Sequence, residues 1–366
     1  MLLTLRAAYI RAQRIEEGGL FRRAVSARQP QGSRGVWPLI EVNFEEWLMH
    51  KNYLLVTLML GAVAALCPAR GHAQTPINCK TRSCYEQLAD DYVAALVAHD
   101  PSRIAFAADA RFVENVKGMK IGNGLWKTAS AAPTTFKVYV PDPVSGQIGF
   151  MGVMQEADKP ILLGLRLQVF AGHVIEAEHV IARDLSPESL ANLQVARPVF
   201  AKVIPQGMRM PRYEIKGIAY SYYDALDFND GDLAPMARDC ERHENGRESS
   251  GSRAPVSAKT QRPNYSAMDC TRQFSTGMMA YIDNIDNIRV LAVDPVTGLA
   301  FGLSHFHHSM KNHVFPIKGV PGVTQRHVDN PPFDLPAAHI FKISDGKIHQ
   351  IEAMGFLAPY SSPAGW

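Results

Sequence analysis

The chain has 366 residues, enough for two or three ordinary domains, and 46% of them are hydrophobic while 20% are charged. This is the composition of a folded globular protein, and it excludes an intrinsically disordered chain. The formal net charge of +3 is too small to indicate a nucleic-acid-binding protein, and no Lys/Arg-rich helix supports one, so we expect no nucleic-acid partner.

The first predicted element is the apolar run Tyr53–Cys67, which is shorter than the ~20 residues that a membrane-spanning helix needs. The basic stretch Met49–Lys51 precedes it, and residues 69–74, which include small side chains, follow it. A basic start, an apolar centre and a small-residue exit are the three parts of a secretory signal. Residues 49–73 are therefore predicted to be a signal peptide cleaved after Ala73, although a single membrane anchor or a buried helix is the alternative.

Residues 1–48 show no strand alternation and only a short amphipathic patch. Because secretory signals lie at the amino terminus, we expect that Met49 is the true start and that residues 1–48 are an overextension of the gene model. The alternative is a real, poorly ordered extension.

Cysteine usage agrees with export. Cys67 lies within the predicted signal, which leaves an even set of four cysteines in the remaining chain. Exported proteins use such sets as disulfides, and we expect the pairs Cys79–Cys84 and Cys240–Cys270. Neither pair has the C-x-x-C spacing of a zinc or redox site, so metal binding through cysteine is not expected. The mature protein is predicted to be periplasmic or secreted, without membrane contact after signal cleavage.

An internal repeat organises the rest of the chain. The offset between matching segments grows along the chain from 130 to 152 to 174 residues. The second copy therefore carries two insertions, around residues 247–268 and 309–335. The matching segments are Tyr92–Asp100 with Tyr222–Asp230, Glu114–Asn115 with Glu244–Asn245, Asp142–Gly146 with Asp294–Gly298, and Leu167–Val174 with Phe341–Ile348.

A helix is predicted at the start of each copy from its apolar spacing. The stripe is regular in the first copy and looser in the second, and its residues are Tyr85, Leu88, Tyr92 and Leu96, then Tyr213, Ile215, Tyr220, Tyr223 and Leu226. A short extended segment follows around Phe112 or Arg242. Alternating strands come next, and their predicted ranges are 136–140 and 148–153, then 288–293 and 299–306.

The last hairpin of each copy is predicted to turn on Gly172 or Gly346. Residues 186–204 are predicted to form a connecting helix within a linker of residues 185–211. A helix followed by a curved antiparallel sheet is an α+β architecture, so we expect two tandem α+β units, residues 79–184 and 212–360, the second with insertions.

Four segments also carry a family resemblance, namely Leu96–Asp100, Gly122–Thr128, Asp239–Gly246 and Cys270–Gly277. The chain resembles a tandem pair from the SnoaL-like branch of the nuclear-transport-factor-2-like superfamily, and more closely an uncharacterised secreted family found in fungi and bacteria. The resemblance covers nearly all of residues 79–360. It implies helices that close one face of a curved sheet, leaving an apolar cone with a few polar groups that binds small molecules.

The sequence contains no G-x-S-x-G, no H-E-x-x-H and no phosphate-cradling glycine loop. We therefore expect no cofactor and no metal, and acid–base chemistry by His, Tyr or carboxylate side chains in an apolar pocket.

Two histidines are the leading catalytic candidates. His305 and His307 alternate with Phe306 on a predicted strand and share one face. If that face lines the cone, the pair could act as general base and acid; the alternative is that the face points to solvent. His305 is the preferred base because the matching strand of the first copy, residues 148–154, has no titratable group. A lesser alternative is a metal ion, disfavoured because no carboxylate partner is evident, shared by His305, His307, His313 and His327.

Further candidates lie near the second disulfide. Arg242, His243 and Glu244 lie beside Cys240, where the resemblance places the pocket mouth. His243 is not repeated in the first copy, whereas a feature found in both copies is more often structural. Arg272, with Tyr281 nearby, could hold an oxyanion or phenolate, or form a surface ion pair instead.

In the first copy, Tyr92, Trp126 and Lys127 could line a pocket, although Tyr92 and Trp126 also fit the core. Taken together, the predicted catalytic residues are His305, His307, His243, Arg272 and Tyr281, and the predicted substrate-binding residues are Arg242, Glu244, Tyr223, Tyr92 and Trp126.

Two functions follow from these observations. The resemblance implies a cofactor-independent lyase or isomerase that acts on a bulky aromatic small molecule, and its members include sphingomonad enzymes that release formaldehyde from lignin-derived diaryl compounds. The alternative is a non-catalytic periplasmic protein that binds an apolar small ligand. We expect His243, His305, His307 and Arg272 to converge in one cavity if the protein is an enzyme and to be scattered if it is a binder. A homo-oligomer is compatible with either.

Overall fold

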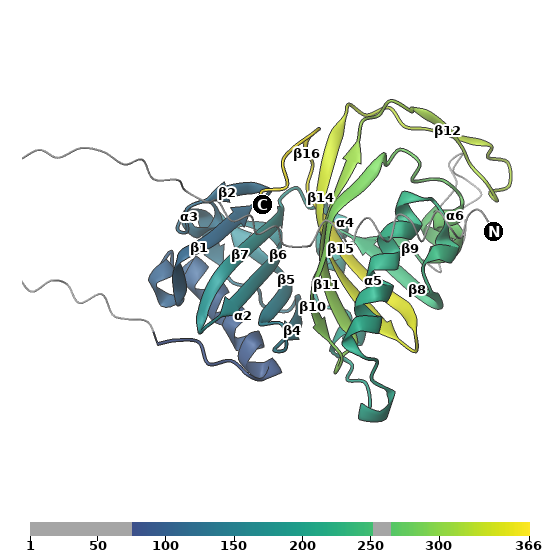
Figure 1. The fold of residues 1–366 in the computed structure, drawn as a ribbon. Helices are drawn as coiled ribbons and strands as arrows, with labels where there is room; N and C mark the ends of the chain where they lie inside the picture. The colour runs from purple at the N-terminus through teal and green to yellow at the C-terminus, as the bar shows by residue number, and fades with distance from the viewer. Residues whose placement is uncertain (1–74, 252–264) are drawn as a thin grey trace, which may run out of the picture. The chain divides into compact units, whose positions relative to one another are not determined.

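The computed structural model describes residues 75–251 and 265–366, and all of them lie in one compact unit, residues 69–366. The predicted signal peptide and residues 1–48 lie outside the described residues. Among the described residues, no helix is long and apolar enough to cross a membrane. The fold is α+β, with two seven-stranded sheets, each packed against a long helix (Figure 1).

The first sheet is built from residues 106–182 and has the order β2-β1-β7-β6-β5-β3, with β4 beside β5. Its pairs are antiparallel except β1 with β7, which are parallel. Helix α2 (Arg82–Val97) precedes it. The other elements are η1 (Pro101–Arg103), β1 (Phe106–Glu114), β2 (Lys117–Met119), α3 (Leu125–Thr128), β3 (Ala129–Ala131), β4 (Lys137–Asp142), β5 (Gln147–Glu156), β6 (Lys159–Phe170) and β7 (His173–Ala182).

The second sheet repeats this order as β9-β8-β15-β14-β11-β10, again with one parallel pair, β8 with β15, and with a short strand β16 beside β14. Helix α5 (Arg212–Asp227) precedes it. The remaining elements are η4 (Gly231–Leu233), β8 (Met236–Glu244), β9 (Arg247–Ser250), η5 (Tyr265–Ala267), α6 (Cys270–Ser275), β10 (Asn284–Asp294), β11 (Leu299–His308), β12 (Val314–Pro316), β13 (Gln325–His327), β14 (Phe333–Ser344), β15 (Lys347–Gly355) and β16 (Ala358–Pro359).

The predicted final hairpins are confirmed. In both copies two residues connect the strands, Ala171–Gly172 between β6 and β7 and Asp345–Gly346 between β14 and β15. All four residues have positive φ, between +48° and +80°. This is the conformation of a two-residue turn whose twist matches that of the flanking strands, and glycine adopts it at the second position without strain.

Two details of the predicted helices are wrong. The connecting helix is only one short turn, α4 (Pro187–Asn192), followed by the 3₁₀ turns η2 (Pro198–Ala201) and η3 (Gln206–Met208). Proline at 198 and 205 cannot donate the backbone hydrogen bonds that a continuous helix needs. Tyr213 is 74% exposed rather than part of the buried stripe, because it lies in the first turn of α5, outside the packed face.

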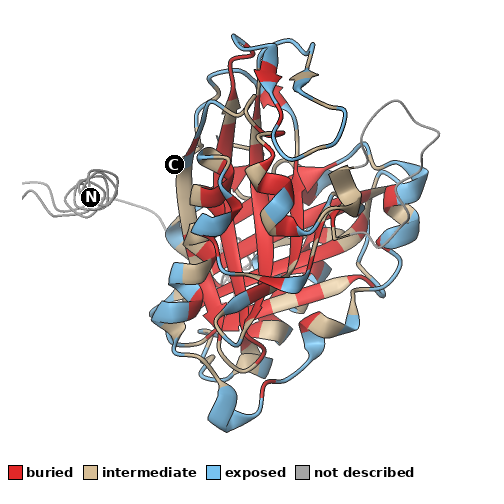
Figure 2. Ribbon diagram, turned by 90° about the vertical axis from the view of Figure 1, so that its right-hand side faces the viewer, coloured by how far each residue is buried: buried red, intermediate tan, exposed pale blue. Residues whose placement is uncertain are grey.

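Each helix buries one face against its own sheet. We call the apolar interior between α2 and the first sheet the first cone, and the one between α5 and the second sheet the second cone. The opposite faces of the two sheets pack against each other through a third apolar cluster that includes Phe136, Met151, Phe301 and Ile340. Strands such as β11 are consequently buried on both faces, as the buried stretches along the strands in Figure 2 show.

Matching ion pairs join the two copies. Arg82 of α2 donates to Asp294 at 2.8–3.0 Å, and Arg212 of α5 pairs with Asp142. The two arginines occupy matching positions of the repeat, and so do the two aspartates. Each helix therefore binds the turn of the other copy, as two subunits related by a two-fold axis would do.

Both predicted disulfides are present. Cys79 is bonded to Cys84 and Cys240 to Cys270. The second bond joins β8 to α6 across the insertion that contains the undescribed residues 252–264. Disulfides of this kind are typical of proteins that fold in an oxidising compartment outside the cytoplasm.

Candidate functional site

His305 and His307 share one face of β11 as predicted, but this face does not line the second cone. Ala300 and Phe306 belong to the second-cone core, whereas Leu299, Phe301 and Leu303 belong to the cluster between the sheets. The β11–β14 register is continuous, so the odd-numbered residues, including both histidines, all face away from the cone. The prediction that this pair lies in the cone is therefore wrong.

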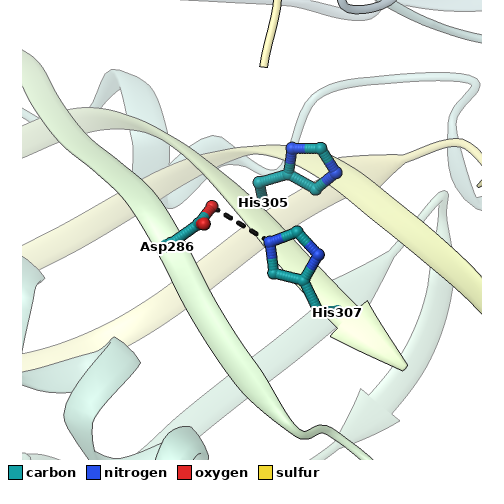
Figure 3. Close-up of side chains that lie close together, drawn as sticks. All are labelled: Asp286, His305 and His307. Atoms are coloured by element: carbon teal, nitrogen blue, oxygen red, sulfur yellow. Dashed lines mark ion pairs between the residues drawn. The ribbon is translucent and has the colours of Figure 1, made fainter. Parts of the chain in front are cut away.

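The histidine pair has acidic partners that the sequence did not reveal (Figure 3). The two imidazole rings are stacked, with centroids 4.6 Å apart. Asp334 on β14 is fully buried and lies 2.9 Å from His307 Nδ1, and Asp286 on β10 lies 3.1 Å from His307 Nε2. Burial, and next the neighbouring His307, lower the pKa of His305. Burial also lowers the pKa of His307, but its two aspartate partners more than offset this and raise it.

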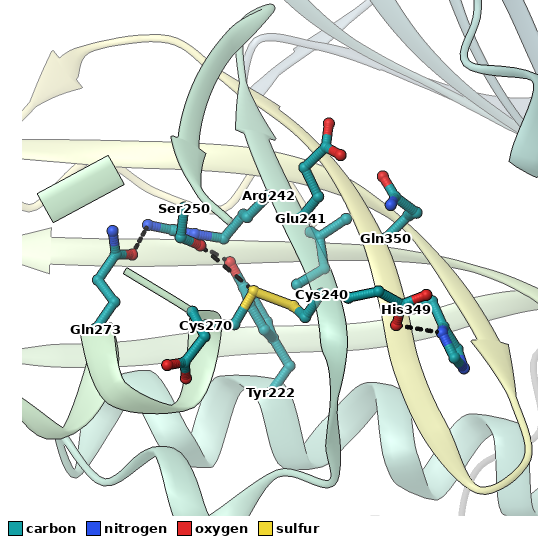
Figure 4. Close-up of a disulfide and its surroundings, with 12 residues drawn as sticks. Tyr222, Cys240, Glu241, Arg242, Ser250, Cys270, Gln273, His349 and Gln350 are labelled. Carbon is teal, nitrogen blue, oxygen red and sulfur yellow. Dashed lines mark hydrogen bonds and ion pairs between the residues drawn. A yellow bond between two sulfur atoms is a disulfide. The ribbon is translucent and has the colours of Figure 1, made fainter. Parts of the chain in front are cut away.

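The second cone holds a polar cluster centred on Arg242 of β8 (Figure 4). Arg242 is 2% exposed. Its Nη1 donates to the Tyr222 hydroxyl at 3.4 Å and pairs with Glu244, and its Nη2 donates to Gln273 Oε1 at 3.0 Å. The guanidinium also lies over the ring of Phe274, 5.1 Å from its centroid. A buried cation is thus held by aromatic and amide groups, and its Nε has no hydrogen-bond partner among the described residues.

A tyrosine–histidine pair lies in the same cone. The Tyr223 hydroxyl is 3.2 Å from Nδ1 of His339, which β14 directs to the cone face. Burial and then the charge of Arg242 lower the pKa of His339 to about 3, so this imidazole is neutral at pH 7. Burial raises the pKa of Tyr223 well above its usual value, so its hydroxyl keeps its proton. The pair is a neutral donor and acceptor beside a fixed positive charge.

The cluster reaches the surface at Glu244, whose side chain is 49% exposed. Tyr281 lies at the edge of the same cluster, half-buried. Burial and then the charge of Glu244 raise the pKa of Tyr281, while Arg326 and Arg242 act in the opposite direction. Of the predicted site residues, the structure therefore brings Arg242, Glu244, Tyr223 and Tyr281 together.

The first cone contains a closed chain of polar groups. The Tyr92 hydroxyl is 3.0 Å from His179 Nε2, and His179 Nδ1 is 3.3 Å from Glu114, which also accepts from the Leu125 N–H at 2.9 Å. Tyr92 and His179 are fully buried, and Glu114 is 4% exposed. Burial raises the pKa of Glu114, but His179 and its other partners more than offset this and lower it. These three groups bond to one another, and Glu114 also lies 3.7 Å from the partly exposed Arg183.

Trp126 and Lys127 are the other two residues that could have lined a pocket in the first copy. Trp126 is 1% exposed and packs edge-on against Tyr92 at 5.2 Å, so the core interpretation of these two aromatic residues fits the structure. Lys127 is exposed.

Two predicted catalytic residues lie outside the second cone. His243 alternates with Arg242 on β8 and therefore faces the other side of the sheet, where its Nε2 lies 2.6 Å from Glu241. Arg272 is exposed and donates to the Gly319 carbonyl at 3.0 Å, which matches neither an oxyanion site nor the predicted ion pair. The four residues chosen as the test of convergence, His243, His305, His307 and Arg272, are therefore scattered over different faces.

Sequence reasoning missed His339, His179, Asp334 and Asp286. A usable signal existed for one of them: the alternation of apolar residues in 173–182 places His179 on the same face as Ala177 and Ile181, which are core residues. The two aspartates gave no such signal: Asp334 pairs with β11 across the insertion, and the position of Asp286 opposite His305 depends on two register shifts in the β10–β11 pair.

Two groups of described residues could bind a metal ion. Asp286, His305 and His307 offer ligand atoms that lie within 4.8 Å of one another, and so do Glu241, His243 and Glu248. The predicted alternative that added His313 and His327 to the metal ligands is not supported, because neither belongs to a group found among the described residues.

Comparison with known families gives one match. Residues 208–355 match the model of a domain of unknown function (DUF8021). This range contains the second cone and both groups of possible metal ligands. No curated protein matches the chain.

Comparison with solved structures gives matches that each span about 40% of this chain. A protein described as a candidate polyketide cyclase from Xanthomonas campestris pv. campestris shares 18% identity over 39% of this chain and 90% of its own, with a TM-score of 0.25. AusH from Aspergillus nidulans shares 11% identity over 40% and 86%, also with a TM-score of 0.25. A SnoaL-like candidate polyketide cyclase from Jannaschia sp. CCS1 shares 12% identity over 40% and 89%, with the same TM-score. At these values the matches support no statement about activity.

Proposed function

We propose that the second cone is a site of cofactor-independent general acid–base chemistry, of lyase or isomerase type, on a small and largely aromatic molecule. The observation that carries the proposal is the Arg242 guanidinium, 2% exposed, bound to a buried tyrosine and to the half-exposed Glu244. Burying a cation is costly unless it is paired, and the carboxylate that bonds to Arg242 among the described residues, Glu244, lies at the surface. An anionic or developing oxyanion group of a ligand would take the place of that carboxylate.

The three groups supply complementary roles. Arg242 would stabilise an enolate, phenolate or alkoxide, because a fixed charge in an apolar site is far more effective than one in water. Burial raises the pKa of Tyr222, which Arg242 opposes, so this phenol remains a proton donor at pH 7. Glu244 is half-exposed and would remove a proton from the substrate. His305 has no part in this scheme because it faces away from the cone.

The most specific substrate that we propose is a lignin-derived diaryl compound that carries a hydroxymethyl group. Glu244 would deprotonate the hydroxymethyl oxygen, and the C–C bond to that carbon would break to release formaldehyde. The electron pair would then form a C=C bond and expel the neighbouring hydroxyl, which Tyr222 would protonate to water. Atoms and charge balance without an oxidant or a metal.

The second candidate is a binding protein without catalytic activity. Two observations favour it: the four residues of the convergence test are scattered, and the aromatic side chains Tyr222, Tyr223 and Phe274 are fully buried against one another within the cone. In this case Arg242 would hold the anionic group of an aromatic ligand and no bond would change.

The experiment compares Arg242→Met with Arg272→Met, the same change at an exposed arginine of the same half of the chain. Aromatic diols and diaryl propanediols are screened for formaldehyde release or isomerisation, and vanillate, an aromatic carboxylate, for binding by calorimetry. We expect Arg242→Met to lower kcat/KM by about 10²–10³-fold and Arg272→Met to leave it unchanged. Because loss of Arg242 could impair folding, Tyr222→Phe is a second variant, expected to lower kcat with little effect on KM.

The outcomes separate the two candidates. Turnover that depends on Arg242 and Tyr222 supports the enzyme. Saturable vanillate binding that depends on Arg242, with no turnover of any compound in the panel, supports the binding protein. Turnover or binding that Arg242→Met and Tyr222→Phe both retain in full would place the site elsewhere.

We also propose that the protein is exported to the periplasm or secreted, in keeping with its two disulfides. Amino-terminal sequencing of protein recovered from the periplasm of a Gram-negative host should find Gln74 as the first residue. Recovery of a stable cytoplasmic product that starts at Met1 would contradict this.

A further inference from the structure

A histidine pair and two aspartates lie together on the face of the second sheet that turns away from the second cone. Asp286 on β10 is directly opposite His305 on β11, and Asp334 on β14 is directly opposite His307. These side chains share one face because cross-strand partners and alternate residues of a strand point the same way. The cluster is separate from the proposed acid–base site, since β11 directs Phe306 into the cone and both histidines to the other side.

We propose that Asp286, His305 and His307 bind a divalent transition-metal ion of the zinc type. One ligand atom from each residue lies within 4.8 Å of the other two, and His307 Nε2 is 3.1 Å from Asp286 Oδ1 (Figure 3). Nitrogen and oxygen ligands of a tetrahedral zinc ion lie at ~2 Å from the metal and hence about 3.3 Å from each other. Two imidazoles and a carboxylate form a donor set that zinc and neighbouring first-row metals accept.

Asp334 orients His307 through the nitrogen opposite the proposed metal ligand. It is fully buried, its Oδ1 is 2.9 Å from His307 Nδ1, and its Oδ2 accepts from the Ser362 N–H at 2.8 Å. A carboxylate on Nδ1 fixes the tautomer of the imidazole and leaves Nε2 as the metal ligand, as is usual for metal-binding histidines. Nε2 of His307 is the atom that faces Asp286.

Two ring nitrogens lack hydrogen bonds. His305 is 2% exposed, and its Nε2, although 3.2 Å from Asp334 Oδ2, is not aligned for a hydrogen bond. His307 Nε2 is likewise buried and lacks an aligned partner among the described residues. Unsatisfied buried polar atoms are rare and costly, and a bound cation would satisfy both nitrogens.

There is also room beside the cluster. A cavity of about 20 Å³ adjoins His305 and is lined by residues of both sheets, among them Glu178 and Arg289. This is enough for about one water molecule, which could complete the coordination of a metal that has three protein ligands. Because the cavity lies between the sheets, we infer that the ion stabilises the packing of the two copies.

The test is zinc binding to the full-length protein, freed of metal with EDTA and dialysed. Titration calorimetry with ZnCl₂ and metal analysis after gel filtration should find one zinc per chain, with a rise in the melting temperature. His307→Ala and Asp286→Asn should abolish this binding, and Asp334→Asn should weaken it by about 10–100-fold. Asp286 is 55% exposed, so its substitution leaves the fold intact even if the histidine variant does not fold.

The matched control is His243→Ala. His243 belongs to the other group of possible ligands, with Glu241 and Glu248, on a different strand. We expect this variant to bind zinc as the unaltered protein does. No zinc binding by the unaltered protein, or binding lost in His243→Ala and retained in Asp286→Asn and His307→Ala, would overturn the proposal.

Discussion

The two cones hold the same tyrosine at the same position of the first helix and surround it differently. Tyr92 meets the imidazole of His179, whereas its counterpart Tyr222 meets the guanidinium of Arg242. Arg242 of the second copy occupies the position of Phe112 in the first copy. Ala353 of the second copy occupies the position of His179 in the first, as the matching registers of the two parallel strand pairs show. Two exchanges on one scaffold thus replace an imidazole by a guanidinium as the partner of this tyrosine.

The matching glutamates show the consequence. Glu114 is 4% exposed and accepts from His179 and Leu125, while Glu244 is 49% exposed and pairs with Arg242. The buried polar groups of the first cone are therefore bonded mainly to one another, which is typical of a structural core. The second cone keeps a charged group inside and its carboxylate partner at the surface, which is the arrangement expected of a site that exchanges the carboxylate for a ligand.

The largest expected difference concerns the two disulfides. Replacing both Cys240 and Cys270 by Ser opens a loop of 30 residues and should lower the free energy of unfolding by roughly 4 kcal/mol on the chain-entropy estimate. Replacing Cys79 and Cys84, only 5 residues apart, should cost about 2 kcal/mol. Urea unfolding of the two variants measures the loss of unfolding free energy in each. Equal losses would show that loop length does not govern the contribution of these disulfides.

The second difference concerns the matching glutamates. Glu114→Ala leaves His179 and the Leu125 N–H without their acceptor in a buried site and should cost about 3 kcal/mol of stability. Glu244→Ala removes a half-exposed carboxylate and should cost about 1 kcal/mol or less. Thermal and urea unfolding at pH 7 provide the comparison. A larger loss for Glu244→Ala would contradict the view that the first cone is the structural one.

The third difference is a pH dependence that His339 should give to the second cone. The folded-state pKa of His339, about 3, lies below its unfolded value near 6.5, so the unfolded state binds the proton first as the pH falls. The stability contributed by the neutral imidazole is complete above pH 6.5 and is lost progressively from there down to about pH 3. Between pH 7 and pH 5 the loss should be about 2 kcal/mol.

His339→Gln provides the control, because glutamine accepts a hydrogen bond but does not titrate in this range. The difference in unfolding free energy between pH 7 and pH 5 should shrink in this variant. At the repeat-equivalent position the first copy has Leu165, so His339 has no counterpart in the first copy. An unchanged pH dependence in His339→Gln would show that other groups dominate it.

The smallest effect should come from the ion pairs that join the copies. Asp142 and Asp294 are each 1% exposed but also accept backbone N–H bonds, so neither is left without partners when its arginine is removed. Arg82→Ala and Arg212→Ala should therefore each cost about 1 kcal/mol. Similar values in urea unfolding would support the two-fold relation between the copies, and a large effect of one alone would contradict it.

Much of the fold could be predicted from the sequence because the signals are local. The apolar spacing from Tyr85 to Leu96 predicted α2, and the glycines at 172 and 346 predicted the tight hairpins, since both depend on a few neighbouring residues. The even set of cysteines predicted both disulfides. Arg242, Glu244, Tyr223 and Tyr281 were selected because they lie near Cys240 or on the predicted helix stripe, and the structure places them in one cluster.

The sequence could not show on which face of the second sheet His305 lies. Alternation shows which residues of β11 share a face but not which face is inside, and a strand that is buried on both sides has no polar face to mark the outside. The sequence by itself determined the repeat, the hairpins and the covalent bonds. Only the tertiary structure decided that His305 and His307 meet Asp286 and Asp334 rather than the cone, because this depends on which face of the second sheet packs against the first sheet and on the pairing of β11 with β14 across the insertion.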